Sequence, residues 1–531
     1  MTALYPFLLA AARVLYQAYR NPGYYTLGDL AVVIAAVLAG LALVYALAAW
    51  LLRGRGAGLP AFVTSLAVLW LFQFDRVAHT LPLLPHRLQY LLLGVLGLVV
   101  CVLLVRWLAR RAEVLRTVSV LLTLTGALLV LRFGVGIAQD QWRERGELAR
   151  SAIARRLAEP IRASAPAPGP QRDVYLIVLD EYANAEVLRD GLGFDNTPFL
   201  DSLRALGFYV PKAVWSNYTM TAHSLPSLLN AAHIYPLARE LPPGSADPTL
   251  ENHLLAESRV ASFLQAQGYR VVFFPSLWSG STRALPLADS TVHVWNGFNL
   301  DRELSRTEFR RVLRTFTPID YVHRDEPYDG DFVRRTLAGV ARLPSVEAPV
   351  FAFAHVMSPH WPFVFDRDCR GLPRSARMRP RRELYTGQVS CLNRMVLATV
   401  TRLVRDPKVP PIILLQGDHG SAVHGFFTSP SNESVSATNA WERFGAFGAY
   451  YLPEGGAAAF GDSVSVVNVL GNVLRYYFRA DLPREPDDRY LAVEAQPYRF
   501  ARVDPAWVAS GDTVRRPSSR TGANPVPSAT H

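Results

Sequence analysis

The sequence is poor in cysteine, with three in 531 residues, and it has no internal repeat and no nucleic-acid-binding motif. Its net charge of +11 would suit an acidic partner, but without a recognition motif it does not indicate nucleic-acid binding. Basic residues beside a membrane more simply contact anionic head groups. The N-terminus also lacks the basic segment and small-residue cleavage site of a secretory signal peptide, so we expect no cleaved leader.

Hydrophobic residues make up half of the chain and are concentrated in residues 1–137. A bilayer is spanned by roughly 20 apolar residues. Four segments qualify or come close: 29–51, 58–74, 88–108 and 114–137. A fifth segment, 3–19, contains Arg13 and either crosses the membrane or lies in its interface as an amphipathic helix. The sequence therefore predicts a transmembrane domain of four or five helices over residues 1–137.

Arginines in the loops predict the orientation of this domain. The loops at 52–57 and 106–116 are basic, and basic loops tend to remain in the cytoplasm. That placement puts everything after residue 137 on the other side of the membrane. We therefore expect a multi-pass protein of the inner (plasma) membrane with an extracytoplasmic, periplasmic domain.

The remainder of the chain is predicted to contain three parts. Residues 138–172 predict a connector, in which a charged, alanine-rich helical stretch leads into a proline-rich linker. Residues 173–480 predict a soluble α/β domain. Residues 481–531 form a C-terminal extension that we expect to be disordered beyond about 510.

Apolar strands alternate with helices in residues 173–480. The expected strands are 173–179, 269–274, 349–355 and 411–416, and the expected helices are 196–206, 224–232, 251–267, 331–342 and 384–405. This order predicts a mostly parallel sheet covered by helices on both faces. Ligands of such sheets bind beyond the carboxyl ends of the strands, where Asp180, His355 and Asp418 stand.

Hard metal ligands follow two of these strands. Asp180 and Glu181 end the first, and Asp418-His419-Gly420 follows the last. A carboxylate next to an imidazole, before a glycine that lets the chain turn sharply, suits zinc or manganese. Calcium or magnesium are alternatives, as is a purely structural role for the strand-end acids in a cap or turn. We expect one or two divalent ions.

A hydroxyl-rich segment, residues 216–230, lies between these strands in the sequence. We expect Thr221 to be a nucleophile near the N-terminus of a helix, where backbone N–H groups can hold a phosphate or sulfate oxygen. A metal ion would lower the pKa of its hydroxyl. Thr219 and Ser224 are alternative nucleophiles, and Thr221 could instead be a plain helix cap.

Several other polar residues are candidates for the site. His355 and His360 frame a loop after a strand, and we expect His360 to bind a second metal or the substrate and His355 to support it. His424 is a candidate for the second metal or for general acid work. Asn217 could contact an oxyanion or serve in a turn. His223 could touch the substrate or face solvent.

These motifs resemble the alkaline phosphatase/sulfatase superfamily, in particular its membrane-anchored branch, which includes lipoteichoic acid synthases and lipid A phosphoethanolamine transferases. Residues 216–226 are similar to the transferases' nucleophile segment, and residues 418–420 to their Asp-His-Gly motif. Their His-Gly-Pro loop is similar to residues 360–362, which lack the glycine. The resemblance covers residues 173–480.

The resemblance implies particular roles for these residues. Thr221 would carry a covalent intermediate and would itself bind the metal. Asp418 and His419 would be further metal ligands, and the strand-end ligand would be Asp180 or Glu181.

The chain also departs from these families. Formylglycine-forming sulfatases carry Cys-x-Pro-x-Arg, and the nearest match, residues 224–228, lacks both the Cys and the Arg, which argues against formylglycine chemistry. The transferases' cysteine-rich disulfide pattern is absent, so transfer of that head group does not follow. Cys369 and Cys391 lie in the outer domain, where a disulfide can form, but the sequence does not establish their pairing. Cys101 lies in an apolar segment, where we expect it to pack.

Together these features predict a membrane-anchored, metal-dependent enzyme that transfers or hydrolyses a phospho- or sulfo-ester of a membrane lipid or cell-envelope glycan. One alternative is a sulfuric ester hydrolase or phosphodiesterase with water as acceptor. Another is a catalytically inactive scaffold for envelope assembly. No nucleic-acid partner is expected, and the oligomeric state does not follow from the sequence.

Overall fold

The computed structural model describes residues 3–23, 25–54, 58–79, 86–165, 167–242, 244–276, 285, 287–292, 294, 309–310, 313, 330–343, 349–372 and 381–509. Contacts divide the chain into two compact units. The first comprises Met1–Glu147 with Phe298–Pro327, and the second Leu148–Gly297 with Tyr328–His531. The residues beyond about 510, expected to be disordered, lie outside the described ranges.

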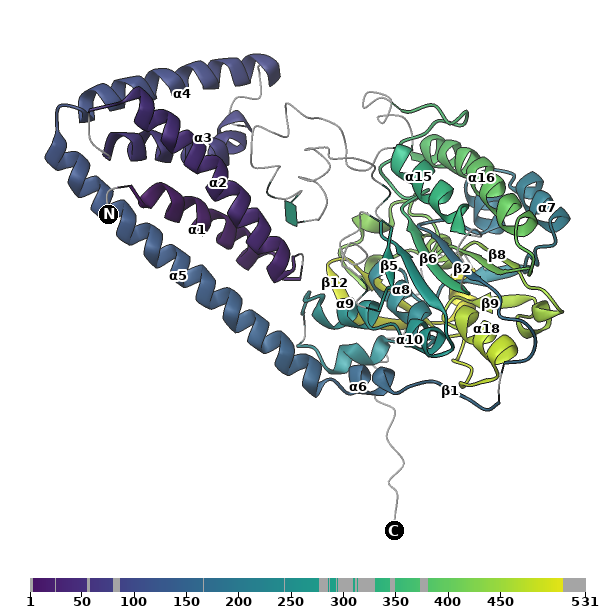
Figure 1. The fold of residues 1–531 in the computed structure, drawn as a ribbon. Helices are drawn as coiled ribbons and strands as arrows, with labels where there is room; N and C mark the ends of the chain where they lie inside the picture. Colours follow the sequence, from purple (N-terminus) through teal and green to yellow (C-terminus); the bar gives the residue numbers. More distant parts are fainter. Residues whose placement is uncertain are drawn as a thin grey trace, which may run out of the picture. The chain divides into compact units, whose positions relative to one another are not determined.

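The first unit contains the predicted N-terminal helices (Figure 1). They are α1 (Tyr5–Arg20), α2 (Leu27–Leu51), α3 (Gly58–His79), α4 (His86–Leu108) and α5 (Ala112–Arg150). Within the described ranges, three stretches are long and apolar enough to cross a membrane: Leu27–Leu51, Leu91–Leu108 and Ala112–Arg150. The apolar part of α3, Gly58–Gln73, is shorter. The predicted membrane anchor is therefore confirmed, while the number of spanning helices stays a prediction.

Two of these helices bear on the sequence analysis. Helix α1 buries Ala10, Val14 and Ala18 at a spacing of four residues, so it has one apolar face packed in the unit. Helix α5 continues to Arg150 without a break, into the first part of the stretch expected to form the connector. A short helix, α6 (Ala152–Ala158), follows it, and the Ser151 side chain caps the N-terminus of α6.

The second unit is built on a six-stranded sheet in the order β5-β4-β6-β2-β7-β8. Its strands are β2 (Val174–Leu179), β4 (Arg270–Phe274), β5 (Ser290–Thr291), β6 (Val350–Val356), β7 (Ile412–Gln416) and β8 (Gly448–Tyr451). All neighbours pair in parallel except β7 and β8. The four predicted strands are found to within one residue, and the prediction of a mostly parallel sheet is confirmed.

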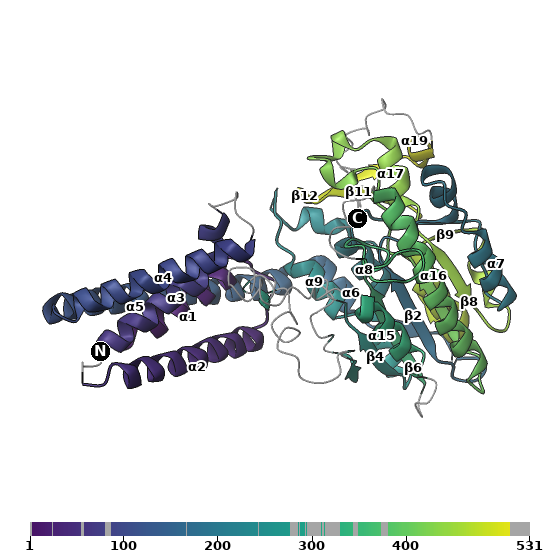
Figure 2. The ribbon, with the colours of Figure 1, turned by 90° about the horizontal axis from the view of Figure 1, so that it is seen from above.

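Helices cover both faces of this sheet (Figures 1 and 2). Because side chains alternate along a strand, Tyr175, Ile177 and Leu179 of β2 share one core with α7 (Thr197–Ala205), α15 (Gly330–Val340) and α16 (Arg381–Arg405). The intervening Val174, Leu176 and Val178 share the other with α8 (Thr221–Asn230), α10 (Arg259–Ala266) and α18 (Asn468–Phe478). Burial on both faces explains why β2 is a continuous apolar run.

The helical boundaries differ clearly from the predictions at three places. The stretch expected as one helix, 251–267, is two, α9 (Thr249–Ala256) and α10, because the Ser258 hydroxyl accepts a hydrogen bond from the Ala261 N–H and starts a new helix. Helix α8 begins at Thr221 and α16 begins at Arg381, each three residues before its predicted start.

The remaining elements are short. They are β1 (Arg162–Ala163), β3 (Ala213–Trp215), α17 (Ala437–Phe444), β9 (Ser463–Ser465), β10 (Ala480–Asp481) and α19 (Pro505–Ala509). Cys369 and Cys391 form a disulfide, which joins the loop after β6 to α16. Cys101, in α4, is free and half-buried.

A C-terminal hairpin, β11 (Arg489–Val493) and β12 (Gln496–Val503), is attached to the segment that precedes α8. The Thr219 hydroxyl donates to the Ala492 carbonyl at 2.6 Å and accepts from the Ala492 N–H at 3.1 Å. The Tyr490 N–H donates to the Asn217 carbonyl at 2.8 Å. Residues after 480 therefore help to position the start of α8.

Candidate active site

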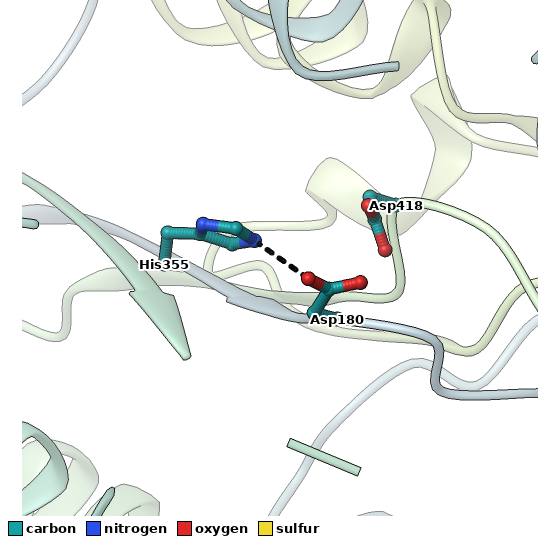
Figure 3. Close-up of side chains that lie close together, drawn as sticks. All are labelled: Asp180, His355 and Asp418. Carbon is teal, nitrogen blue, oxygen red and sulfur yellow. Dashed lines mark ion pairs between the residues drawn. The ribbon is translucent and has the colours of Figure 1, made fainter. Parts of the chain in front are cut away.

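The ends of three adjacent strands bring Asp180, His355 and Asp418 together (Figure 3). Asp180 directly follows β2, His355 lies in β6 opposite Val178, and Asp418 follows the end of β7. One ligand atom from each of the three side chains lies within 4.8 Å of the other two. His355 Nε2 is 3.5 Å from Asp180 Oδ2. The parallel register thus gathers three of the predicted residues at one edge of the sheet.

His419 completes this cluster. Its Nε2 lies 3.1 Å from Asp418 Oδ2 and 3.9 Å from Asp180 Oδ1. Its Nδ1 faces the Gly420 carbonyl at 3.2 Å. Because a carbonyl only accepts hydrogen bonds, Nδ1 carries the proton, and Nε2 is an acceptor that lies beside the carboxylate oxygens.

Gly420 is required for a reason other than the sharp turn expected from the sequence. A Cβ at this position would lie 2.0 Å from the Glu442 carbonyl oxygen and 2.6 Å from the Gly445 carbonyl oxygen. The Gly420 N–H donates to the Arg443 carbonyl at 2.8 Å. The glycine therefore allows the Asp-His pair to approach the backbone at the end of α17.

Thr221 is the hydroxyl that faces this cluster. It is the first residue of α8 and is half-buried, and its Oγ1 lies 2.9 Å from His419 Nε2 and 3.5 Å from Asp180 Oδ1. The two alternatives are placed differently. Thr219 is fully buried and bonded to Ala492, and Ser224 is buried with its hydroxyl 3.2 Å from that of Ser216.

The two strand-end acids have different partners. Asp180 faces the histidines, whereas Glu181 forms a buried ion pair with Arg443, with 2.5 Å between Oε1 and Nη1. Arg443 was missed by the sequence analysis. The sequence feature that could have indicated Arg443 is the charged pair Glu442-Arg443. This pair lies between Trp441 and Phe444 in the short, partly apolar helix α17.

The electrostatics of the cluster suit a cation. Burial and the neighbouring Asp180 raise the pKa of the Asp418 carboxyl well above its usual value. Burial and Arg443 lower the pKa of His419, which keeps its imidazole neutral. Asp418 Oδ2 is buried and has no hydrogen-bond partner among the described residues.

This donor set fits a divalent metal ion. Buried carboxylate oxygens without donors are costly unless a cation compensates them. Two carboxylates with neutral imidazole nitrogens are ligands of the kind that zinc and manganese accept. Asp180, Asp418 and His355 could therefore hold an ion, with the lone pair of His419 adjacent.

The remaining candidates lie around this cluster. The His360 N–H donates to the Asp180 carbonyl at 3.0 Å; although burial lowers the pKa of its imidazole, the carboxylates of Glu181 and Asp180 raise it above the usual value. His424 is bonded to the Glu442 carboxylate, with 3.0 Å between Nδ1 and Oε2, and this contact raises the pKa of its imidazole.

Two candidates, Asn217 and His223, contact other parts of the fold. The Asn217 side chain donates to the Asp488 carbonyl and accepts from the Val467 N–H, both at 2.8 Å, so its amide is engaged in joining chain segments. His223 is fully buried, which corrects the expectation that it might face solvent. Its Nε2 lies 3.6 Å from Oε2 of the buried Glu251.

The sequence was compared with known protein families, and residues 172–459 match the sulfatase family. The chain belongs to the sulfatase family. The matched segment runs from the start of β2 past β8 and includes every residue of the cluster described above. This membership confirms the superfamily and the alkaline-phosphatase-like fold inferred from the motifs. A search of curated proteins found no match.

Three solved structures to which the chain is similar are described next. The C-terminal periplasmic domain of EptC from Escherichia coli, in complex with zinc, has 12% identity and a TM-score of 0.45, with 67% of this chain and 99% of that chain covered. The lipooligosaccharide phosphoethanolamine transferase EptA from Neisseria meningitidis has 13% identity and a TM-score of 0.37, with 90% of this chain and 94% of that chain covered. A putative sulfatase, YidJ from Bacteroides fragilis, has 13% identity and a TM-score of 0.36, with 60% of this chain and 75% of that chain covered. Similarities at this level do not assign a substrate.

Proposed function

We propose that this sulfatase-family protein is a membrane-anchored, metal-dependent enzyme that cleaves a phospho- or sulfo-ester by way of Thr221 and transfers the group to an acceptor. The observation that carries the proposal is the position of the Thr221 hydroxyl, 2.9 Å from His419 Nε2 and 3.5 Å from Asp180 Oδ1. A nucleophile needs a nearby base and an accessible position. Of the three candidate hydroxyls, Thr221 combines both.

The residues of the cluster support distinct parts of this chemistry. Asp180, Asp418 and His355 would hold the ion, which when bound stabilises the negative charge that develops at the reacting group. The Thr221 hydroxyl oxygen would form the new bond to phosphorus or sulfur while the bond to the leaving oxygen breaks. Its proton has two acceptors within reach, His419 Nε2 and Asp180 Oδ1.

The start of α8 would bind the anionic oxygens of the same group. The first N–H groups of a helix have no partner within the helix, and the helix dipole favours negative charge there. Because Thr221 is the first residue of α8, these N–H groups lie beside the nucleophile. A covalent Thr221 ester would then be resolved by an acceptor hydroxyl.

Two exposed aromatic residues favour an acceptor with an apolar or sugar portion. Trp361, directly after His360, is 56% exposed, and Phe427 is 43% exposed. The Phe427 ring centroid lies 5.0 Å from Arg443 Cζ, so this ring reaches the cluster. A membrane lipid or envelope glycan presents such surfaces, and the anchor of apolar helices keeps the enzyme at a membrane. In this proposal the catalytic domain is periplasmic.

Water as the acceptor is the second candidate, because nothing in the covalent step requires another hydroxyl. Intact-mass measurement of the full chain, purified in detergent with metal and incubated with phospholipid or sulfated glycan donors, tests the proposal. We expect a donor-dependent mass gain that peptide mapping places on Thr221. A gain that maps to Ser224 or Thr219 would contradict the assignment. An added acceptor that accelerates loss of the adduct identifies a transferase, whereas an unchanged rate identifies a hydrolase.

A further inference from the structure

Part of the outer domain's sequence packs within the N-terminal unit. The chain leaves the second unit after Gly297 and rejoins it at Tyr328, and the residues between them group with the N-terminal helices. We call these residues, Phe298–Pro327, the insert. Its described residues are Phe309, Arg310 and Leu313. The insert therefore brings the chain back to a part of the molecule whose own sequence ends at Glu147.

Two apolar side chains of the insert belong to the core of the N-terminal unit. Phe309 and Leu313 are buried and helical, and a spacing of four residues places them on one face of a helix. They lie in one cluster with buried residues of α1, α2, α3 and α5. The Phe309 ring centroid is 5.3 Å from that of Tyr25, which precedes α2. Burial of apolar surface is the main force that drives one segment to bind another.

An ion pair accompanies this apolar contact. Arg310 Nε donates to Asp29 Oδ1 at 2.6 Å, and Arg310 Nη2 lies 2.6 Å from the same oxygen. The Asp29 side chain is 9% exposed and the Arg310 side chain 15%. Asp29 lies in the first turn of α2, where its N–H donates to the Thr26 hydroxyl at 3.1 Å. Because a nearly buried charge is costly unless it is paired, Asp29 requires a basic partner at this place.

The position of Asp29 in α2 supports a dedicated partner. The sequence of α2 contains no other charged residue, and this helix is long and apolar enough to cross a membrane. Charged residues in such helices pair with one another or with other polar groups. The loop 52–57, at the far end of α2, is predicted to be cytoplasmic. Asp29 is then expected on the side of the membrane to which the outer domain belongs, where Arg310 can reach it.

We propose that the insert is an intramolecular docking element: the outer domain binds its own membrane anchor through Phe309 and Leu313, and the pair of Asp29 and Arg310 is the latch of this attachment. The outer domain then has two attachments to the anchor, the covalent connection after Glu147 and the docked insert. The anchor is a binding partner of the outer domain as well as its tether. This proposal does not depend on the enzymatic activity, so the two can fail separately.

Cleavage of the covalent attachment tests the docked one. A flexible loop with the site of a sequence-specific protease would be inserted after Gly146 in the full chain, and an affinity tag at the N-terminus would hold the anchor. This position leaves α6 with the outer fragment, so that the anchor fragment keeps no part of the second unit. The fraction of outer fragment that stays with the tagged anchor would be measured in a mild detergent, which prevents retention by bulk lipid.

Five forms would be compared: wild type, R310D, the exchanged pair D29R/R310D, F309A and R143D. R143D is the matched control, because Arg143 forms an exposed ion pair with Asp140 in the same unit. Size-exclusion chromatography of each uncut form would show that it is folded. The outer fragment of the wild type should remain bound. R310D should lower the retained fraction at least about tenfold, since it places two acids together in a nearly buried position.

The remaining forms separate the latch from the apolar contact. The exchanged pair should recover at least about half of the wild-type retention, because the opposite charges face each other again. F309A should lower retention about fivefold or more, since it leaves a cavity in the core of the anchor. R143D should retain the outer fragment as the wild type does, because an exposed ion pair contributes little.

Other outcomes would overturn the proposal. Release of the wild-type outer fragment on cleavage would show that the insert does not hold it. Equal retention by wild type and R310D, or an equal loss in R310D and R143D, would show that the pair with Asp29 is not a latch. If the exchanged pair does not fold, F309A decides, because it leaves both charges in place. Unchanged retention in F309A would exclude docking through the apolar face.

Discussion

Asp180 and His355 face each other across two neighbouring parallel strands, with 3.5 Å between the carboxylate Oδ2 and the imidazole Nε2. Their strands are paired residue for residue, with Leu179 opposite Val356. Because a parallel register holds both strand ends at the same edge of the sheet, the separation of these two groups is set by the backbone.

Replacement of Thr221 by alanine should abolish the covalent adduct and lower turnover by about 10³-fold or more, because among the described residues Thr221 presents the hydroxyl nearest to His419 Nε2. Bound metal should be largely retained, since the carboxylates and imidazoles remain. Elemental analysis and intact mass on the same sample would check both points. S224A serves as a matched control, because it removes a buried hydroxyl from the same helix. Full activity in T221A would refute the nucleophile assignment.

Removal of the metal should destabilise the folded protein. A ligand present at about 100 times its Kd stabilises the folded state by about 2.7 kcal/mol, so a chelator should lower the Tm of the wild type. D418N should carry little metal, and its Tm should respond weakly to chelator. D462N is the control, because Asp462 is an exposed partner of Lys212. Equal chelator responses in D418N and wild type would show that the ion lies elsewhere.

Stability should fall with rising pH because of Glu251. Burial raises the pKa of this carboxyl to about 8 from 4.5. A folded-state pKa above the unfolded value means that its contribution is fully present below about pH 4.5 and is lost as the pH rises towards 8. Burial lowers the pKa of the neighbouring His223 to about 3. Its contribution to stability therefore changes between about pH 3 and 6.5, where it rises with pH.

Thermal unfolding between pH 6.5 and 8.5 should be compared in wild type and E251Q, because the pKa values of His360 and His424 are also raised above 6.5 and both proteins share these groups. The contribution of Glu251 to the stability of the wild type should fall by about 2 kcal/mol over this window, at about 1.4 kcal/mol for each pKa unit. E251Q cannot titrate and should show a flatter dependence. The same slope in both proteins would exclude Glu251 as the cause.

Trp361 should contribute to binding of the acceptor rather than to the covalent step. W361A removes an exposed ring beside His360, so the KM for a lipid or glycan acceptor should rise about fivefold to tenfold, as for loss of about 1 kcal/mol of aromatic contact. The rate of adduct formation without acceptor should stay within about twofold. Y476A is the matched control, because Tyr476 is an aromatic residue on α18 that is 38% exposed. Equal effects of the two substitutions would argue against a specific role.

The core strands and the strand-end cluster were predictable because β2, β6 and β7 are buried on both faces and so form uninterrupted apolar runs that end in polar residues. Strand β8 was not, because Gly448 and Ala449 give it a weak strand signal and its pairing is settled by its neighbour β7. The split at Ser258 was missed because a cap within a continuous helical pattern is a local event.

Partners that meet only in the folded chain could not be derived from the sequence. Asp180 and Glu181 are adjacent, and only the position of Arg443 on α17 separates their surroundings. The pairing of Cys369 with Cys391 likewise depends on where α16 packs. The buried pair of His223 and Glu251 arises from the contact between α8 and α9.

The two hydrogen bonds between Thr219 and Ala492 have a consequence for biogenesis. The segment that leads into Thr221 is anchored by a residue near the end of the described chain, so a protein still being synthesised lacks that support. The nucleophile would be fully positioned only once the C-terminal hairpin has been made and has crossed to the same side of the membrane. Such an arrangement would delay competence for catalysis until this hairpin has been made, and chains that end before it would be inactive even when they contain every residue of the cluster.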